Sequence, residues 1–170
     1  HPNGCIVNTG CGLDFICENI CSTSQKIYNV DYFEVINLRK KLLQTNHNVI
    51  NISSDLKDFS WLDKIQEKKE VLFFASGVFY YLQKEEVINL LLNIEHKFSD
   101  SKIVFDIANK KAVKLMVKSL LKDINNVNAY FYIDNFKDFQ SQFKKAKVSY
   151  RPYLTGYYSM KKVSLLYKLI

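Results

Sequence analysis

Five apolar runs of strand length recur along the chain, and helical spacing follows most of them. The runs lie at residues 5–9, 26–30, 48–52, 71–75 and 102–107. Such alternation is typical of β-α-β units, in which parallel strands share one sheet and the connecting helices cover both of its faces. The sequence therefore predicts an α/β fold with a doubly wound, mostly parallel sheet.

Three of the connecting segments place apolar residues at helical spacing, which predicts the side of each helix that packs inward. These positions are Val35, Ile36, Leu38, Leu42 and Leu43 in the first, Val87, Leu90, Leu91, Ile94 and Phe98 in the second, and Val113, Met116, Val117, Leu120 and Leu121 in the third.

The last forty residues have a different pattern. A short helix with Phe136, Phe139 and Phe143 on one face precedes two β-rich segments, 147–159 and 163–170. Two such segments close together favour an antiparallel hairpin at the sheet edge over another crossover. With 170 residues, the chain is expected to form a single domain over residues 1–170.

Composition excludes several classes of protein. No apolar run approaches the roughly 20 residues that cross a bilayer, so we expect no membrane segment and a cytoplasmic protein. The net charge is +7, but the Lys and Arg residues are interspersed with Asp and Glu along the chain. The simplest interpretation of this charge is that it keeps the protein soluble. We therefore expect no nucleic-acid partner, although Lys111, Lys114, Lys118 and Lys122 share one predicted helical face. The spacing of Cys5, Cys11, Cys17 and Cys21 is not that of a metal site, and buried thiols in a reducing compartment are expected instead.

Two glycines, Gly10 and Gly12, end the first predicted strand. In doubly wound sheets ligands bind at this point, and glycine lets a ligand approach the backbone closely. A tight turn with no ligand is the alternative explanation. The position three residues after Gly12 is Phe15, so the third glycine of a dinucleotide-binding loop is missing. A nucleoside without a pyrophosphate fits better, and S-adenosylmethionine is a common one.

Two acidic residues follow the next strands. Asp31 lies about twenty residues after the glycines, where a carboxylate can accept both hydrogen bonds of a ribose diol. Its alternative role is to cap the helix predicted over 32–43. Asp55 ends the third strand and Leu56 follows it; the Asp55 carboxylate could accept from the adenine amine, and the Leu56 backbone N–H could donate to a ring nitrogen. A capped turn, with Asp58 or Ser60 starting the helix that carries Trp61, is the other possibility.

Five stretches in this order resemble the leucine carboxyl methyltransferase-like group of class I methyltransferases, which includes the tetracenomycin-type polyketide O-methyltransferases. They are VNTGCGLD, YNVDYFEVINLRKKLL, SSDLKDFSWLDKI, VLFFASGVFYYLQKEEVINLL and IVFDI. The resemblance implies a Rossmann-like domain that uses S-adenosylmethionine to methylate a hydroxyl or carboxylate of a small molecule.

The resemblance also implies a site, residue by residue. Its cofactor part comprises Gly10, Cys11 and Gly12 beside the methionine and ribose, Asp31 with Tyr32 at the ribose, Ser54, Asp55 and Leu56 at the adenine, and Ser76 with Gly77 facing the sulfonium. Tyr80 and Tyr81 are the candidates for contact with the acceptor. No catalytic residue is assigned, and His96 is expected at the surface.

The sequence also departs from the group. The relatives continue the first motif as G-L-D-T-R, whereas this chain has Phe15 and Ile16 after Asp14, and Ser76 stands where they carry Glu. Phe33 replaces a proline, and the helices that precede the first strand in the group are not in the sequence, so we expect that an N-terminal segment is missing. The alternative function is therefore a degenerate or truncated relative that acts as a binding module without transferase activity. Neither the acceptor nor the oligomeric state follows from the sequence.

Overall fold

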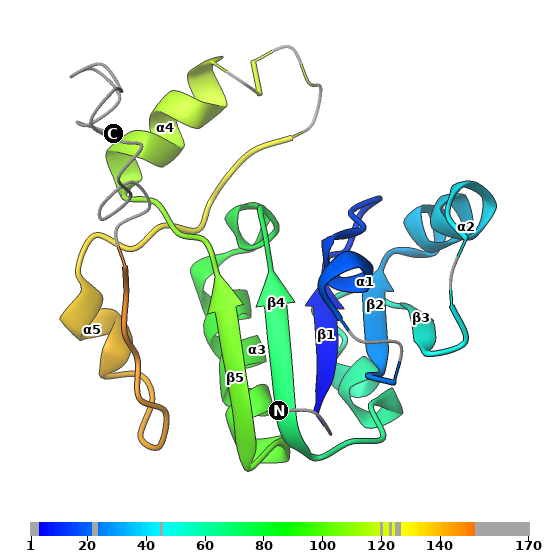
Figure 1. The fold of residues 1–170 in the computed structure, drawn as a ribbon. Coiled ribbons are helices and arrows are strands. Elements are labelled where there is room, and N and C mark those ends of the chain that lie inside the picture. Colours follow the sequence, from blue (N-terminus) through cyan, green and yellow to red (C-terminus); the bar gives the residue numbers. More distant parts are fainter. Residues whose placement is uncertain are drawn as a thin grey trace, which may run out of the picture. The chain divides into compact units, whose positions relative to one another are not determined.

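The computed structural model describes residues 4–21, 24–44, 46–119, 121, 122, 124 and 127–151 (Figure 1). The chain divides into two compact units, His1–Asp134 and Asn135–Ile170. The single domain expected over residues 1–170 stays a prediction. Among the described residues, no helix combines the length and apolar character needed to cross a membrane.

The first unit contains a five-stranded sheet in which every pair of neighbouring strands is parallel. Its strands are β1 (Cys5–Thr9), β2 (Ile27–Asp31), β3 (Val49–Ser53), β4 (Lys69–Ala75) and β5 (Asp100–Phe105). They lie in the order β3-β2-β1-β4-β5. The chain thus adds β2 and β3 on one side of β1 and then β4 and β5 on its other side, so that the strand order switches between β1 and β4. The predicted parallel α/β sheet is confirmed, with strand ends that differ from the predicted ones by at most two residues.

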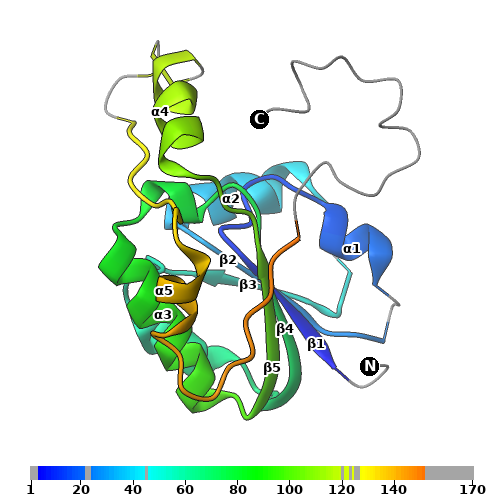
Figure 2. The ribbon, with the colours of Figure 1, turned by 90° about the vertical axis from the view of Figure 1, so that its left-hand side faces the viewer.

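Helices lie on both sides of this sheet. The helices of the first unit are α1 (Ile16–Ile20), α2 (Phe33–Leu42), α3 (Lys84–Lys97) and α4 (Lys110–Ser119), with the 3-10 helices η1 (Phe59–Lys64) and η2 (Phe79–Tyr81). Of these, α4 lies beyond the carboxyl end of β5 and not on a face of the sheet (Figure 1). Figure 2 shows α1 and α3 on opposite faces of the sheet. This arrangement is the one predicted from the alternation of strands and helices.

The two faces of β4 pack against different partners because successive side chains of a strand point to opposite sides. Phe73 contacts the rings of Trp61 and Phe98 at centroid distances of 6.4 and 5.1 Å on one face. Leu72 and Phe74 pack on the other face against the cluster of Ile6, Cys17 and Ile27. All five positions predicted to face inward around α3 are buried.

The prediction for α2 is wrong in part. Leu38 and Leu42 are 46% and 62% exposed, whereas Ile36 and the charged Arg39 are buried. Positions 36 and 39 lie three residues apart on one side of the helix, and Arg39 is buried there in an ion pair with Glu18 of α1. In α4, Val113 is buried, while Met116 and Val117 are half-buried; Leu121 follows the helix and is buried. Leu120 lies outside the described residues.

The second unit contains α5 (Phe136–Gln140), the short helix that the sequence predicts. The Asn135 side chain caps it by accepting hydrogen bonds from the backbone N–H groups of Lys137 and Asp138. Ring pairs form between Phe139 and Phe143 and between Phe136 and Tyr150. Residues 147–151 are not in a strand, and the rest of the predicted hairpin, residues 152–170, lies outside the described residues.

Candidate functional site

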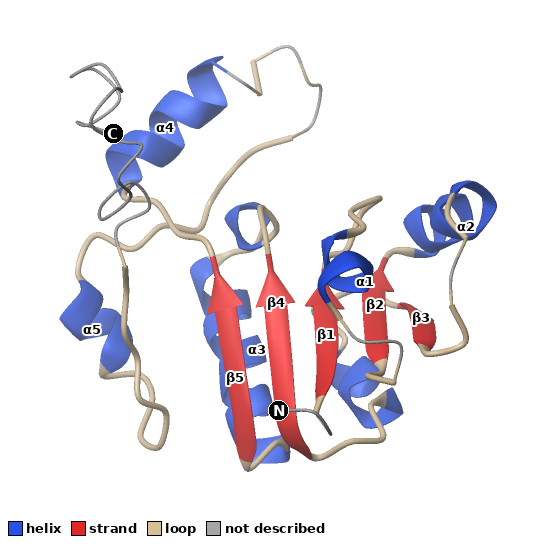
Figure 3. Cartoon of the chain, in the orientation of Figure 1, coloured by secondary structure: helices blue, strands red, loops and turns tan. Residues whose placement is uncertain are grey.

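The predicted site residues follow the carboxyl ends of four neighbouring strands. Because all strands are parallel, these ends meet at one edge of the sheet (Figure 3). Asp31 is the last residue of β2, and the others lie in the loops that follow β1, β2, β3 and β4. The point at which the strand order changes side, between β1 and β4, lies among these loops. Ligands of doubly wound sheets bind at such a point.

Gly10 and Gly12 are required for different reasons. Both have positive φ, +69° and +50°, which disfavours any residue with a Cβ. A Cβ on Gly10 would lie 2.4 Å from Cγ2 of Val78, in the loop after β4, whereas a Cβ on Gly12 would meet nothing within 4 Å. The missing side chain of Gly10 therefore lets the loops after β1 and β4 approach each other, and Gly12 borders open space. Cys11, between them, is buried, and its N–H donates to the Val30 carbonyl at 3.2 Å.

Asp31, the last residue of β2, holds the glycine loop. Its Oδ2 accepts a hydrogen bond from the Gly12 N–H at 2.7 Å, and its Oδ1 accepts one from the Tyr32 N–H at 2.8 Å. The alternative of a helix cap is wrong, because α2 begins at Phe33 with Tyr32 as its N-cap and has no side-chain cap. Each carboxylate oxygen has a second lone pair, so Asp31 can still accept hydrogen bonds from a ligand.

Tyr32 is exposed beside this carboxylate. Burial of its hydroxyl and the nearby charge of Asp55 raise its pKa above the usual value. The ring therefore stays neutral near neutral pH and can donate a hydrogen bond.

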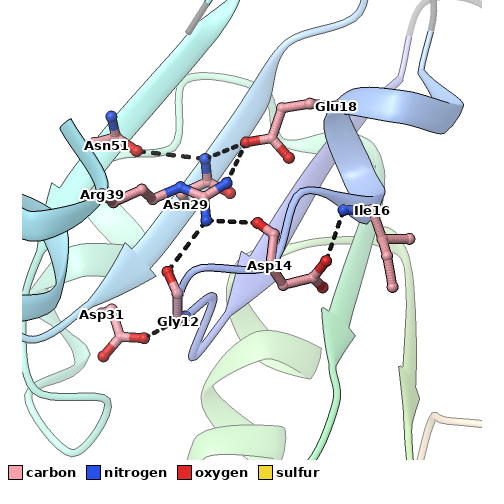
Figure 4. Close-up of polar contacts among 8 residues, drawn as sticks. All are labelled: Gly12, Asp14, Ile16, Glu18, Asn29, Asp31, Arg39 and Asn51. Atoms are coloured by element: carbon pink, nitrogen blue, oxygen red, sulfur yellow. Dashed lines mark hydrogen bonds and ion pairs between the residues drawn. The ribbon is translucent and has the colours of Figure 1, made fainter. Parts of the chain in front are cut away.

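A buried ion pair supports the glycine loop from behind, and sequence reasoning missed it (Figure 4). The guanidinium of Arg39, from α2, contacts the carboxylate of Glu18, from α1. Its Nη1 also donates to the carbonyl oxygens of Gly12 and Asp14 at 3.1 and 2.5 Å. An arginine from another helix thus binds the loop in which the sequence lacks the arginine of the G-L-D-T-R motif.

The ion pair rests on a row of asparagines. Asn8, Asn29 and Asn51 occupy equivalent register positions on β1, β2 and β3. The Asn29 amide donates to Glu18 at 2.9 Å and to the Asn51 side chain at 3.3 Å (Figure 4). Only the polar residues within otherwise apolar strands could have indicated this network from the sequence.

Asp55 lies two residues beyond β3, which ends at Ser53 rather than at Asp55 as predicted. Its Oδ1 accepts from the Lys57 N–H at 3.0 Å, and its Oδ2 lies 3.6 Å from the Lys57 ammonium. Ser54 connects this turn to β2 through a hydrogen bond to the Asp31 carbonyl at 2.9 Å. Leu56 is buried and forms an apolar wall beside the turn. Asp31 and Asp55 are therefore brought to neighbouring loops.

The turn after Leu56 continues into η1 as one of the predicted alternatives. Asp58 is the N-cap, and its side chain accepts from the Ser60 N–H at 3.1 Å. Trp61 is fully buried, with its indole N–H 3.4 Å from the Leu56 carbonyl. The capped turn and a ligand contact at Asp55 are thus compatible.

Ser76 and Gly77 follow β4 and are both exposed. Gly77 has a φ of +67°, and a Cβ there would meet nothing within 4 Å. Its N–H donates to Oδ1 of Asp106, just after β5, at 2.7 Å. Asp106 was not among the predicted site residues, although its position after the fifth strand is the same signal that singled out Asp31.

Tyr80 and Tyr81 lie in η2, beyond the glycine of this loop. Tyr81 is 45% exposed, so its side chain is accessible. The Tyr80 carbonyl accepts hydrogen bonds from the backbone of Tyr130 and Phe131 at 2.7 and 3.3 Å. A cavity of about 220 Å³ lies along the same segment, and its lining comprises Lys110, Val113, Lys114, Val117, Asn128, Ala129 and Tyr132.

The remaining candidates are the cysteines, His96 and the lysine stripe, and of these Cys11 lies in the glycine loop itself. Cys5, Cys11 and Cys17 are buried, Cys21 is half-buried, and all four are free thiols. Within the described ranges, no group of three or more His, Cys, Asp or Glu side chains could hold a metal. His96 is exposed, as predicted, and so are the four lysines of the predicted stripe, of which Lys122 lies beyond the end of α4.

Comparison of the sequence with known protein families assigns this chain to one of them. The family model described as leucine carboxyl methyltransferase matches residues 3–95, which run from β1 into α3. This match covers more than half of the chain. The chain belongs to the leucine carboxyl methyltransferase family. The matched part includes every predicted cofactor residue and both predicted acceptor residues.

One curated relative of this family member is the tetracenomycin polyketide synthesis O-methyltransferase TcmP of Streptomyces glaucescens. It is 25% identical over 108 residues, which are 62% of this chain and 40% of the relative. The chain thus spans well under half of the length of this relative.

Solved structures share the fold at low sequence identity. A SAM-dependent methyltransferase from Anabaena variabilis matches with a TM-score of 0.60 at 12% identity, over 84% of this chain and 63% of that chain. Magnesium protoporphyrin IX methyltransferase from Synechocystis, solved with bound SAH, matches with a TM-score of 0.54 at 14% identity, over the same shares of the two chains. These likenesses support the Rossmann-like methyltransferase fold.

Proposed function

We propose that this protein is an S-adenosylmethionine-dependent O-methyltransferase that acts on a hydroxyl or carboxylate of a small molecule. The observation that carries the proposal is the Asp31 carboxylate, held against the Gly12 N–H at 2.7 Å in the loop after β1. Membership of the leucine carboxyl methyltransferase family supports it. So does the O-methyltransferase activity in the name of its relative from Streptomyces.

The residues present fit a nucleoside with a charged side arm. Gly12 and Gly77 border open space, so neither carries a side chain that would obstruct a ligand. Asp31 would accept the ribose hydroxyls, beside Tyr32. Asp55 and Leu56 would hold the adenine, one as a polar partner and the other as an apolar wall. The loop of Ser76 and Gly77 would border the sulfonium end.

When bound, S-adenosylmethionine supplies a methyl group that is already activated for displacement by an oxygen nucleophile. The protein's task is then to align the acceptor oxygen and exclude water. A carboxylate acceptor needs no general base, whereas a hydroxyl benefits from one. Tyr80 and Tyr81 are our candidates for acceptor contact, because they lie in η2, shortly after the loop of Ser76 and Gly77, and Tyr81 is 45% exposed.

A second candidate function is a binding module of the same fold without transferase activity. Two observations favour it: Ser76 is uncharged, and the Asp55 carboxylate already has a partner in Lys57. A binding module would show no methyl transfer. It would also bind the cofactor more weakly if the site itself has degenerated.

Calorimetric titration with S-adenosylhomocysteine tests the proposal. Asp31→Asn leaves one acceptor oxygen for the backbone N–H groups of Gly12 and Tyr32, and its amide nitrogen cannot accept from ribose. We expect wild-type binding and at least about a tenfold loss of affinity in Asp31→Asn. Asp63→Asn, which changes an exposed carboxylate on η1, is the matched control and should bind like wild type. Absence of binding by folded wild-type protein would overturn the cofactor site, and binding without methylation of any acceptor would favour the binding module.

A further inference from the structure

Asp106 places a carboxylate at the edge of the proposed site, beside the loop after β4. It lies directly after β5, and its Oδ1 accepts the hydrogen bond from Gly77. The Gly77 N–H is thereby turned toward β5, and the glycine keeps the positive φ that a residue with a side chain would resist. Sequence and fold thus bring a negative charge to the loop after β4.

The loop after β4 also contacts the glycine loop after β1. Val78, next to Gly77, fills the space beside Gly10, where a Cβ would approach its Cγ2 to 2.4 Å. The loops after β1, β4 and β5 are therefore linked in one sequence of contacts, Gly10 to Val78 and Gly77 to Asp106. Asp106 is therefore hydrogen-bonded to Gly77, whose neighbour Val78 makes the contact with Gly10.

The charge of Asp106 has no partner in the part of the chain that the structure describes. No cation pairs with it there, and its Oδ2 accepts no hydrogen bond. Asp55, by comparison, is paired with Lys57, and Ser76, in the neighbouring loop after β4, is neutral. A carboxylate in this state favours a cationic ligand, because an opposite charge compensates it at short range.

We propose that the Asp106 carboxylate stabilises the positive sulfonium of S-adenosylmethionine. This inference rests on the proposed function, and it assigns a ligand-binding role to a residue that neither sequence reasoning nor the comparisons singled out. Its consequence is selectivity: the charged cofactor is bound more tightly than S-adenosylhomocysteine, which has lost the sulfonium charge together with the methyl group. Release of the product is favoured by the same difference.

Asp106→Asn isolates the charge, because the amide oxygen can still accept the hydrogen bond from Gly77. Affinities for S-adenosylmethionine and S-adenosylhomocysteine are measured side by side by calorimetry on the full chain. We expect affinity for the first to fall about tenfold and affinity for the second to change less than about threefold. Asp100→Asn removes the same charge from the exposed opposite end of β5 and should change neither affinity.

A second variant separates charge from loop geometry. Ser76→Glu in the Asp106→Asn background places a carboxylate in the loop after β4. This double variant should recover part of the preference for the charged cofactor. Equal losses for both ligands in Asp106→Asn, or no loss for either, would overturn the sulfonium role while the proposed function stands. If wild-type protein binds neither ligand, the proposed function fails, and the inference fails with it.

Discussion

The side chains of Arg39 and Glu18 form an ion pair that is almost entirely buried, with exposures of 0% and 1%. It joins α2 to α1 and binds the carbonyl groups of Gly12 and Asp14 in the loop between β1 and α1. Burying two charges is costly unless each compensates the other, so removal of one partner leaves the other without compensation. The pair is therefore a point at which the glycine loop can be tested without touching the proposed ligand contacts.

Arg39→Met should lower the free energy of unfolding by about 3–5 kcal/mol, because the Glu18 charge and two loop carbonyls lose their donor. Glu18→Gln should be destabilising as well. The double variant should cost less than the sum of the two single ones, since no unpaired charge remains. Urea unfolding checks this, with exposed Lys40→Met as the control; additive effects would contradict the pairing.

Gly10→Ala and Gly12→Ala separate steric conflict from backbone conformation. Both glycines have positive φ, so each substitution should cost about 1 kcal/mol from conformation alone. Only the new Cβ at position 10 meets Val78, and Gly10→Ala should therefore be more destabilising by a further 1–3 kcal/mol, on the order of an overpacked core site. Thermal unfolding measures the difference. Equal costs would mean that the two loops do not approach as closely as the structure has them.

Stability at acid pH should depend on Glu67. Burial alone would raise the pKa of Glu67, but hydrogen bonds from Lys26 and Tyr28 outweigh it, and its pKa is lowered from the usual 4.5. A carboxyl whose pKa is lower in the folded than in the unfolded state stabilises the protein at pH values above its unfolded-state pKa. This contribution is lost as the pH falls through the folded-state pKa. Glu67→Gln should lower the Tm at pH 7 and flatten its decline below pH 4.5. Asp100→Asn is the control, and an unchanged acid profile in Glu67→Gln would contradict the prediction.

The thiols should differ in reactivity. Burial raises the pKa of Cys5, Cys11 and Cys17 to about 12, so that at pH 8 roughly one thiol in ten thousand is a thiolate. Burial and the charge of Glu18 also raise the pKa of Cys21, but this side chain is only half-buried. A thiol reagent at pH 8 should modify Cys21 first, and Cys21→Ser should remove that fast phase. Rapid modification of all four thiols without denaturant would show that the N-terminal part of the sheet opens readily.

Local pattern was sufficient for the elements of this fold. The apolar runs of β1 to β5 and the spacing of Val87, Leu90 and Ile94 in α3 follow from periods of two and 3.6, which any short stretch of chain displays. The same reasoning placed Gly10, Gly12, Asp31 and Asp55 after successive strands. It was wrong at Leu38 and Leu42, because helical spacing does not tell that a charged residue of the same helix, Arg39, is buried with a partner from another helix.

The sequence by itself thus determined the parallel α/β sheet and the loops in which the candidate residues lie. Only the tertiary structure decided which of these loops touch: Val78 beside Gly10, Asp106 bonded to Gly77, and Arg39 paired with Glu18. These contacts depend on β4 lying next to β1 and β5 next to β4, an order that no local period encodes. It arises when strands distant in the chain bury their apolar faces together, and the polar side chains at their ends are then brought within hydrogen-bonding distance.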